Sequence, residues 1–271
     1  MDLMLEGKVA IVTGATGICK ATALKLAEEG SDIVMTYLTD QDREATDESI
    51  KEITNIMGRK AIALPLDLLK LDTISEMVQT ALNEFSRIDI LVNCAGVCTA
   101  VLAEDVTENQ WDLDAGVDLK GLFFVSKEVF NKTMKKQRSG TIVNVASVVG
   151  VNPIKTNPIY SVAKAGVISI TRYLAIEWGP YNVRVNSISP GWIATEMLIE
   201  HQKSGKSADP NSVIRNIPLG RFGEPKEIAD TITFLASGKS SFTNGANFVV
   251  DGGIIAGIRL SSLVNGKIEI L

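Results

Sequence analysis

Short β-branched apolar runs alternate along this chain with longer segments in which apolar residues recur at helical spacing, and this alternation limits the folds available to it. Strands are predicted over residues 9–13, 33–36, 61–66, 88–93, 141–145, 183–188 and 247–250. Helices are predicted between them, the first two over residues 17–30 and 42–57. Because strands joined by helices form right-handed βαβ units, the pattern predicts an α/β fold with a parallel sheet. The strands are apolar throughout, which indicates helices on both faces of that sheet.

The domain organisation predicted from the sequence is simple. A length of 271 residues is sufficient for one sizeable core, and no repeat, low-complexity stretch or Pro/Gly linker marks a second domain. We therefore predict a single domain over residues 1–271, with two segments that interrupt the alternation. Residues 193–216 are polar and predict a flap, and residues 254–271 form a C-terminal tail. The tail is too apolar to lie free in water, so we expect it to pack on a neighbouring subunit or to close a substrate pocket.

Charge and composition exclude several classes of function. The net charge is −5, and the strongest basic cluster, residues 132–138, suits a solvated helix end, so no nucleic-acid partner is expected. No apolar stretch reaches the roughly 18 residues of a membrane span, and the N-terminus lacks the basic start of a signal peptide. We therefore expect a cytoplasmic protein without membrane contact. Cys19, Cys94 and Cys98 suit reducing conditions and structural or incidental roles, and we predict no metal site.

The first predicted strand leads directly into a glycine-containing turn and then a helix. Gly14 and Gly17 border this turn, where the backbone can approach a pyrophosphate and the N–H groups of the helix N-terminus can bind it. An ordinary strand–helix turn is the alternative. Asp67, at the end of the third strand, is placed to accept a hydrogen bond from an adenine amino group, or else to cap a helix. Small residues after Asn93 leave room for a cofactor at the end of the fourth strand.

The end of the second strand bears on the choice of cofactor. An acidic residue there would accept a hydrogen bond from the 2′-hydroxyl of NAD and repel the 2′-phosphate of NADP. Tyr37 occupies the expected position instead, and Arg43 and Lys20 are close in sequence. The sequence therefore favours NADP, with NAD as the alternative.

Tyr160 and Lys164 open the helix after the fifth strand, four residues apart and hence on one helix face. A tyrosine ordinarily has a pKa of about 10. An ammonium within about 4 Å contributes about 4 kcal/mol at an effective dielectric of 20, enough to lower that pKa by roughly three. Tyr160 would then be an effective general acid/base near neutral pH, whereas a surface pair is the alternative. Ser147, thirteen residues earlier at the end of the fifth strand, could hold the substrate oxygen during proton transfer.

In this order, the elements resemble the short-chain dehydrogenase/reductase family across residues 8–253. The resemblance rests on the first glycine turn, Asp67, residues 93–96, Ser147, Tyr160 with Lys164, and the segments 189–195, 218–225 and 250–253. It implies a Rossmann fold with a doubly wound seven-stranded parallel sheet flanked by helices. It also implies hydride transfer between a nicotinamide and a small molecule, and a homotetramer with candidate contacts through helices at residues 117–134 and 160–178.

The resemblance also implies roles for individual residues. Ser147 would polarise the substrate carbonyl, Tyr160 would be the acid/base, and Lys164 would lower the pKa of Tyr160 and hold the nicotinamide ribose. The cofactor would contact Gly14, Thr16, Gly17, Ile18, Tyr37, Asp67, Leu68, Asn93, Ala95, Gly96, Tyr160, Lys164, Pro190, Gly191, Ile193 and Thr195.

Two further departures from the family pattern matter. The glycine turn is one residue short, and Cys19 stands where the third glycine is expected, so we predict weaker cofactor binding or a shifted pyrophosphate. Asp118 replaces the asparagine that supports a proton-relaying water chain in the family, and we count it among the catalytic residues. A carboxylate can still accept hydrogen bonds but adds negative charge near Lys164, so we expect activity with an altered pH optimum.

The substrate would lie near Ser147, Val149, Asn152 and Trp192. Asn152 and Trp192 could bind a polyhydroxylated molecule by hydrogen bonding and stacking, although a tryptophan also serves as an apolar wall. The sequence is similar to bacterial sugar dehydrogenases, which favours oxidation of an aldose or polyol.

Two alternatives to a sugar dehydrogenase stay open. A 3-oxoacyl carrier-protein reductase would need a basic docking patch for an acidic carrier, to which Arg172, Lys127 and Lys155 could contribute. A degenerate, nucleotide-binding protein without catalysis is the other, and the intact set of Ser147, Tyr160 and Lys164 argues against it.

Overall fold

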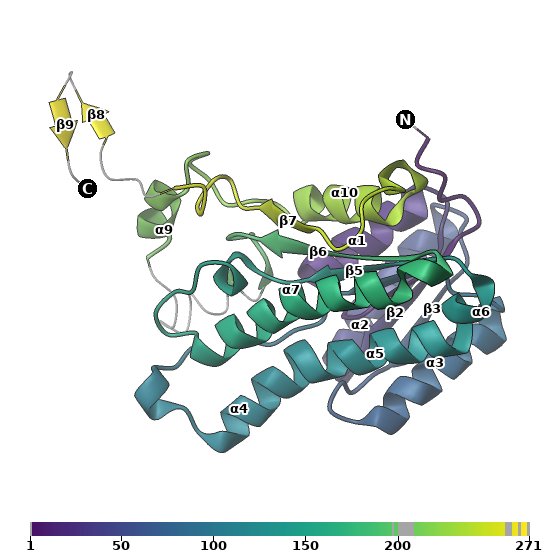
Figure 1. The fold of residues 1–271 in the computed structure, drawn as a ribbon. Coiled ribbons are helices and arrows are strands. Elements are labelled where there is room, and N and C mark those ends of the chain that lie inside the picture. The colour runs from purple at the N-terminus through teal and green to yellow at the C-terminus, as the bar shows by residue number, and fades with distance from the viewer. Residues whose placement is uncertain (1, 197, 200–208, 258–261, 265–266, 270–271) are drawn as a thin grey trace.

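One seven-stranded parallel sheet forms the centre of the protein (Figure 1). The computed structural model describes residues 2–196, 198–199, 209–257, 262–264 and 267–269. The strands run in the order β3-β2-β1-β4-β5-β6-β7, and every neighbouring pair is parallel. Their bounds are β1 Val9–Val12, β2 Asp32–Tyr37, β3 Ala61–Pro65, β4 Ile90–Asn93, β5 Gly140–Val145, β6 Val183–Pro190 and β7 Asn247–Val250. The predicted doubly wound α/β sheet is confirmed.

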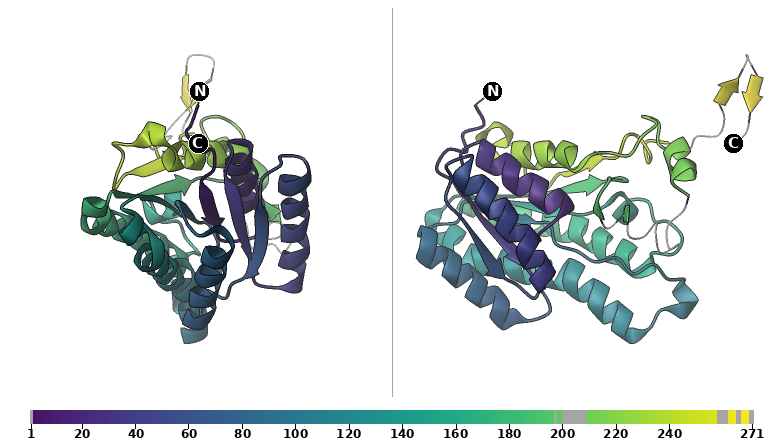
Figure 2. Two further views of the ribbon diagram at one scale, coloured as in Figure 1. Left: turned by 90° about the vertical axis from the view of Figure 1, so that its right-hand side faces the viewer. Right: turned by 180° about the vertical axis from the view of Figure 1, so that it is seen from behind.

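Helices cover both faces of this sheet (Figure 2). One face carries α1 (Gly17–Glu28), α2 (Asp40–Asn55) and α10 (Pro225–Ala236), and the other carries α3 (Leu71–Phe85), α5 (Leu122–Val129) and α7 (Pro158–Trp178). Successive side chains of a strand point to opposite faces, so both faces of a central strand must be apolar. In β1, Ala10 and Val12 join the first of these cores and Ile11 joins the second, all fully buried.

The helix before β5 is longer and less regular than the sequence predicts. It runs without a break from Glu108 to Gln137 and includes α4 (Glu108–Ala115), α5 and α6 (Lys135–Gln137). Two π-helical turns, Gly116–Gly121 and Phe130–Met134, join these parts. A π turn adds a residue to the helical repeat and turns side chains to a new face, and such turns are frequent at functional sites. The first of them carries Asp118.

The order of the strands places a ligand crevice at one edge of the sheet. From β1 the chain proceeds outward through β2 to β3, and then returns to β4 on the other side of β1. In open α/β sheets, ligands bind outside the carboxyl ends of the strands at such a reversal. The turn after β1 and the residues after β4 therefore meet at the predicted nucleotide site.

The remaining described elements lie outside the sheet and its two helical layers. Within the predicted flap the structure shows α9 (Pro210–Asn216), and positions 197 and 200–208 fall outside the described residues. Within the predicted tail, β8 (Ser262–Val264) pairs antiparallel with β9 (Lys267–Glu269), and the two strands stand apart from the main sheet in Figures 1 and 2. Positions 258–261, 265–266 and 270–271 of the tail lie outside the described residues. Short 3-10 turns occupy Ala103–Asp105, Val148–Gly150, Gly179–Tyr181 and Gly238–Ser240.

One helix has the length and apolar composition of a membrane span. This segment, Pro158–Tyr181, is α7 with the turn that follows it, and half of its most apolar stretch is buried in the protein. It packs along β6 and carries Lys164, which is 3% exposed, into the interior beside β5. The apolar character of its buried side is therefore explained by its place in the core.

Candidate active site

A cavity of about 620 Å³ opens at the carboxyl ends of the strands. This volume lies within the range of roughly 300–1,000 Å³ that is usual for small-molecule and cofactor sites. The predicted site residues that line it are Gly14, Thr16, Gly17, Ile18, Tyr37, Asp67, Leu68, Ala95, Gly96, Ser147, Val149, Tyr160, Lys164, Pro190, Gly191, Trp192, Ile193 and Thr195. Segments that are far apart in sequence thus form one pocket, as the resemblance predicts.

The turn between β1 and α1 has the backbone form that a phosphate cradle requires. Gly14 and Gly17 adopt φ values of +103° and +56°, which residues with a side chain rarely adopt. The N–H of Gly14 donates to the Thr36 hydroxyl at 3.0 Å, which fixes the turn against the end of β2. At the start of α1, the side chain of Thr16 makes no capping hydrogen bond. The Cys19 N–H donates to the Thr16 carbonyl at 3.0 Å, whereas the N–H groups before it have no partner within the helix and are available to an anion in the pocket.

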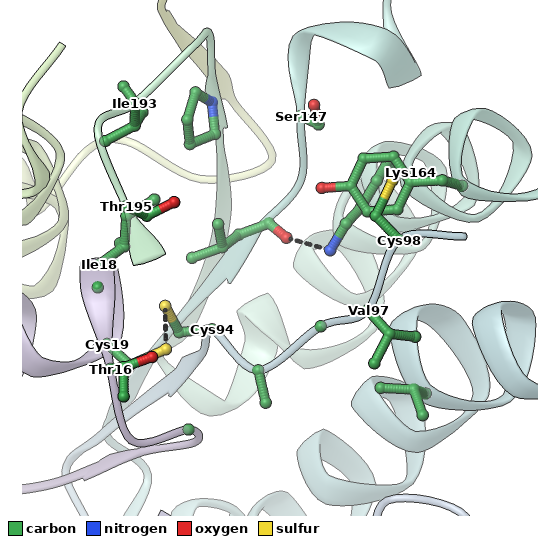
Figure 3. Close-up of a pocket in the computed structure, with 18 of the residues that line it drawn as sticks. Thr16, Ile18, Cys19, Cys94, Val97, Cys98, Ser147, Lys164, Ile193 and Thr195 are labelled. Carbon is green, nitrogen blue, oxygen red and sulfur yellow. Dashed lines mark hydrogen bonds between the residues drawn. The ribbon is translucent and has the colours of Figure 1, made fainter. Parts of the chain in front are cut away.

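Cys19 fits below this shortened turn. A Cβ added to Gly14 would lie 2.6 Å from the Sγ of Cys19, so the glycine makes room for the sulfur. That sulfur lies 3.0 Å from the Sγ of Cys94, just beyond the end of β4 (Figure 3). The side chain thus fills the space in which the family packs helix against strand through a third glycine. The predicted effect on cofactor affinity stays a prediction.

The pocket wall at the ends of β2 and β3 carries carboxylates. Asp67 accepts a hydrogen bond from the N–H of Leu69 at 3.0 Å and pairs with Lys70 at 3.0 Å, so the carboxylate shapes its own turn while it lines the pocket. Asp42, in the first turn of α2, also lines the pocket and accepts a hydrogen bond from the N–H of Thr39 at 3.1 Å. Asp42 is not among the site residues predicted from the sequence, although the Thr39–Asp42 capping box is visible as a motif.

The basic residues that favoured NADP lie elsewhere. The guanidinium of Arg43 stacks 5.7 Å from the centre of the Tyr37 ring and lies 3.8 Å from the Asp47 carboxylate. Neither Arg43 nor Lys20 is among the described residues that line the pocket. Where β2 ends, the described wall therefore presents the Asp42 carboxylate and no cation.

Ser147, Tyr160 and Lys164 meet at the other half of the pocket. Ser147 follows β5, and Tyr160 and Lys164 lie one turn apart at the start of α7. The ammonium of Lys164 donates to the backbone carbonyl of Val145 at 3.1 Å, as the dashed line in Figure 3 shows. It also lies 5.3 Å from the centre of the Tyr160 ring. The ammonium is thus held between the end of β5 and the phenol.

Asp118 lies behind this set, outside the lining of the cavity. Its carboxylate is 3.6 Å from the Lys164 ammonium and accepts a hydrogen bond from the N–H of Val97 at 3.1 Å. A Cβ on Gly96 would lie 2.6 Å from the same carboxylate oxygen, which explains the glycine there. The second oxygen, Oδ2, is buried without a hydrogen-bond partner among the described residues. A buried, unpaired oxygen beside an ammonium is a suitable acceptor for a water or a proton.

Burial changes the titration expected from the sequence. It raises the pKa of Tyr160 to about 12, and Lys164 acts in the lowering direction without reversing the shift. The expectation of a phenol that titrates near neutral pH includes the effect of the ammonium but not that of burial, which acts in the opposite direction. Burial also raises the pKa of Asp118 to about 6, again against the lowering effect of Lys164. With its pKa at about 12, the Tyr160 phenol is protonated at neutral pH and can donate a hydrogen bond or its proton.

Besides Asp118, two further predicted residues do not line the pocket. The Asn93 side chain is buried and donates to Ser126 at 2.9 Å and to Asn144 at 2.8 Å, so it joins β4 to α5 and β5. Asn152 is exposed beyond the turn that follows Ser147 and does not line the cavity. A sequence position at a strand end gives proximity to the site, whereas the direction of the side chain is set by packing. Conversely, Asn157 lines the pocket and donates to the Cys98 sulfur at 2.9 Å, a contact that no motif signals.

A dinucleotide cradle and a serine–tyrosine–lysine set in one pocket define an oxidoreductase of the Rossmann class. The sequence model of the family described as Enoyl-(Acyl carrier protein) reductase matches residues 12–255. A 3-oxoacyl-[acyl-carrier-protein] reductase of Thermotoga maritima is 42% identical over 256 residues, which are 93% of this chain and 100% of that protein. A 2-dehydro-3-deoxy-D-gluconate 5-dehydrogenase of Escherichia coli is 37% identical over 257 residues, 93% of this chain and 97% of that protein.

A solved structure of a short-chain type dehydrogenase/reductase from Mycobacterium marinum superposes with a TM-score of 0.86 at 31% identity, covering 93% of this chain and 97% of that one. The chain therefore belongs to the short-chain dehydrogenase/reductase family, whose members are NAD(P)-dependent oxidoreductases that act on alcohol and carbonyl groups. The resemblance predicted from the motifs is confirmed, and a non-enzymatic role is not supported.

Proposed function

We propose that this enzyme interconverts a secondary alcohol and a carbonyl group on a small polyhydroxylated molecule, with Ser147, Tyr160 and Lys164 as its catalytic residues. The observation that carries the proposal is the convergence of these three side chains on one pocket, with Lys164 anchored to the Val145 carbonyl at 3.1 Å. A bound nicotinamide would supply or accept the hydride at the substrate carbon.

The three side chains have distinct roles in carbonyl reduction. The Ser147 hydroxyl donates a hydrogen bond to the carbonyl oxygen and orients it. Tyr160, which is protonated at neutral pH, donates its proton to the same oxygen as negative charge develops there. The Lys164 ammonium stabilises the tyrosinate that is left behind. Alcohol oxidation reverses these steps, so Tyr160 must then be deprotonated first, and the reaction is favoured at higher pH.

The pocket fits a dinucleotide. The glycine turn, the uncapped start of α1 and the small residues Ala95 and Gly96 form a cradle that larger side chains would fill. The same cradle supports NAD rather than NADP, because the Asp42 carboxylate lines the wall at the end of β2, where a 2′-phosphate would bring negative charge. The sequence favours NADP because Tyr37 stands where an acidic residue is expected and Arg43 and Lys20 are close in sequence, but neither cation is among the described residues that line the pocket.

A sugar or polyol is supported by the small polar groups near the catalytic residues. Lys155, Asn157 and Trp192 line the same pocket as the catalytic residues, so hydrogen-bonding and stacking groups are available there to a polyhydroxylated molecule. The sugar-acid dehydrogenase among the relatives is consistent with such a substrate.

A carrier-bound 3-oxoacyl group is the second candidate, because a relative with that printed activity is 42% identical. It would require basic residues at the mouth of the pocket for the carrier. Lys155 is there, but Arg172 lies twelve residues beyond Tyr160 on α7, about 18 Å at the helical rise of 1.5 Å per residue. Lys127 stacks on the Phe124 ring on α5 and does not line the pocket. Arg172 and Lys127 therefore do not join Lys155 in a docking patch at the pocket, which favours a free small molecule.

The proposal is tested by following nicotinamide absorbance with NAD and NADP against a panel of aldoses, polyols, sugar acids and a 3-oxoacyl thioester. We expect turnover of at least one polyhydroxylated compound, and a loss of about 10²–10⁴-fold in kcat for Tyr160→Phe with the dinucleotide still bound. Undiminished turnover in that variant would overturn the assignment of Tyr160. Turnover of the thioester alone would favour the second candidate.

A further inference from the structure

Two thiols face each other on the floor of the nucleotide pocket (Figure 3). Cys19 lies in the first turn of α1 and Cys94 directly follows β4, 75 positions later in the chain. Their Sγ atoms are 3.0 Å apart, and both residues line the cavity. The proposed reaction uses neither thiol.

The geometry is close to that of a bonded pair. The sulfur atoms of a disulfide are about 2.05 Å apart, so the two thiols need to approach by about 1 Å. Both residues are partly exposed and both are free thiols. The absence of a side chain at Gly14 leaves room for the Cys19 sulfur here, since a Cβ there would lie 2.6 Å from it. The turn that forms the proposed pyrophosphate cradle is therefore also the turn beside which the thiol pair lies.

We propose that Cys19 and Cys94 form a reversible modification site, at which a low-molecular-weight disulfide oxidises the two thiols to an intramolecular disulfide that weakens dinucleotide binding. The second half of this proposal rests on the proposed function, because it requires the cradle to hold a dinucleotide.

The oxidation proceeds by two thiol–disulfide exchanges. The Cys19 thiolate attacks one sulfur of the added disulfide, whose S–S bond breaks as a mixed disulfide forms and one thiolate leaves. Cys94, once deprotonated, attacks the Cys19 sulfur, forms the Cys19–Cys94 bond and releases the second thiolate. The two protons from the protein thiols end on the two released thiols, so one disulfide is reduced as one is formed. The hydrogen bond with Cys19 and burial raise the pKa of Cys94 well above its ordinary value, which makes Cys94 the poorer first nucleophile.

The consequence for binding follows from the position of Cys19 at the start of α1. Drawing its sulfur toward β4 would move the first turn of the helix, whose N–H groups would hold the pyrophosphate of a bound dinucleotide. Cys19 lines the pocket, so a dinucleotide bound there would cover it and keep an oxidant away. Bound nucleotide should therefore slow formation of the disulfide, and the disulfide should weaken binding of the nucleotide.

The test uses the full chain with 2-hydroxyethyl disulfide as the oxidant. Free thiols are alkylated after treatment, and mass spectrometry identifies linked peptides. The Kd for NADH and NADPH is measured by fluorescence before and after oxidation. We expect a Cys19–Cys94 link, slower link formation with saturating nucleotide present, and a Kd raised about tenfold that dithiothreitol restores.

Three variants control this experiment. Cys98→Ser removes the third thiol and is expected to leave the link intact, whereas Cys19→Ser and Cys94→Ser each abolish both the link and the sensitivity of the Kd to oxidant. Circular dichroism establishes that each variant is folded. If only one of Cys19→Ser and Cys94→Ser folds, that variant alone is sufficient for the test. Alkylation of both thiols after full oxidant treatment, or a linked protein with an unchanged Kd, would overturn the proposal. A reduced protein that binds neither nucleotide would instead contradict the proposed function, and the linked peptide would still report on the thiol pair.

Discussion

The charges buried around Tyr160 decide how this site responds to pH. Lys164 favours the tyrosinate, whereas Asp118 and Cys98 oppose it, and burial dominates all three. The chain thus carries a carboxylate where its family resemblance implies a neutral asparagine. The extra charge stands 3.6 Å from the ammonium on which the phenol depends.

Replacing Asp118 by asparagine is expected to shift the pH dependence of alcohol oxidation. With a pKa of about 6, Asp118 is charged above that pH and holds the pKa of Tyr160 up. Asp118→Asn removes this charge and so lowers the pKa of Tyr160. The rise of kcat with pH, which reports the deprotonation of Tyr160, should therefore move to lower pH, and an inflection near pH 6 should disappear. Asp112→Asn, an exposed position on α4, is the matched control. Superimposable profiles for Asp118→Asn and the unmodified enzyme would remove Asp118 from the proton path.

The Asp42 carboxylate is expected to set the preference between NAD and NADP. Asp42→Asn keeps an acceptor for the Thr39 N–H but removes the charge from the pocket wall, so the ratio of the Kd for NADP to that for NAD should fall about tenfold. Asp40→Asn removes a charge from the same helical turn, but Asp40 does not line the pocket, so it should leave the ratio nearly unchanged. Calorimetric titration with both nucleotides measures this ratio, and equal falls in the two variants would show a general electrostatic effect instead.

At the scale of secondary structure, the π turn Gly116–Gly121 links the catalytic half of the site to the nucleotide half. It places Asp118 beside Lys164, and its last residue, Gly121, packs on the segment after β3. A Cβ on Gly121 would lie 2.7 Å from the Cβ of Leu68 and 2.8 Å from its carbonyl oxygen. Leu68 in turn lines the pocket.

Gly121→Ala is therefore expected to lower both stability and nucleotide affinity. Over-packing of this kind costs about 1–3 kcal/mol, because backbone atoms must move to admit the methyl group. Urea unfolding measures the loss, and NADH titration measures the displacement of Leu68. The control is Gly179→Ala at the end of α7, where the added Cβ would meet its nearest atom at an ordinary 3.6 Å. If the two variants unfold at the same urea concentration, the close approach at Gly121 is not what stabilises the turn.

The elements that sequence predicted well are those set by local pattern. Each apolar run became a strand within a few residues of its predicted limits, because a strand buried on both faces needs apolar side chains throughout. The start of α2 was missed by two residues, since the Thr39–Asp42 capping box was overlooked. The π turn has no comparable signal, so only family resemblance led to Asp118. The Asn93 amide illustrates what local pattern cannot predict. Its position at the end of a strand is predicted, but its hydrogen-bond partners on α5 and β5 come from distant parts of the sequence.

At the scale of the whole molecule, the outer face of α7 is more apolar than a solvated helix requires. Val162, Tyr173 and Ile176 are 56%, 59% and 79% exposed, and their spacing places them on one side of the helix. This helix is one of the candidate contacts of the homotetramer that the family resemblance implies. An exposed apolar stripe of this kind is typical of a surface that another subunit covers. We therefore expect α7 to contribute to an interface between copies of this chain.

Ile176→Glu is expected to reduce the molecular mass that light scattering reports after size-exclusion chromatography. An interface centred on Ile176 would have to bury an unpaired carboxylate, which costs more than the isoleucine gained from leaving water. Ile56→Glu makes the same substitution at an isoleucine that is 78% exposed at the end of α2, on the opposite face of the sheet. The mass of that variant should stay at the value of the unmodified protein. An unmodified protein that elutes as a monomer, or an Ile176→Glu variant that keeps the full mass, would show that α7 faces solvent and that the tetramer expected from the family is not built through it.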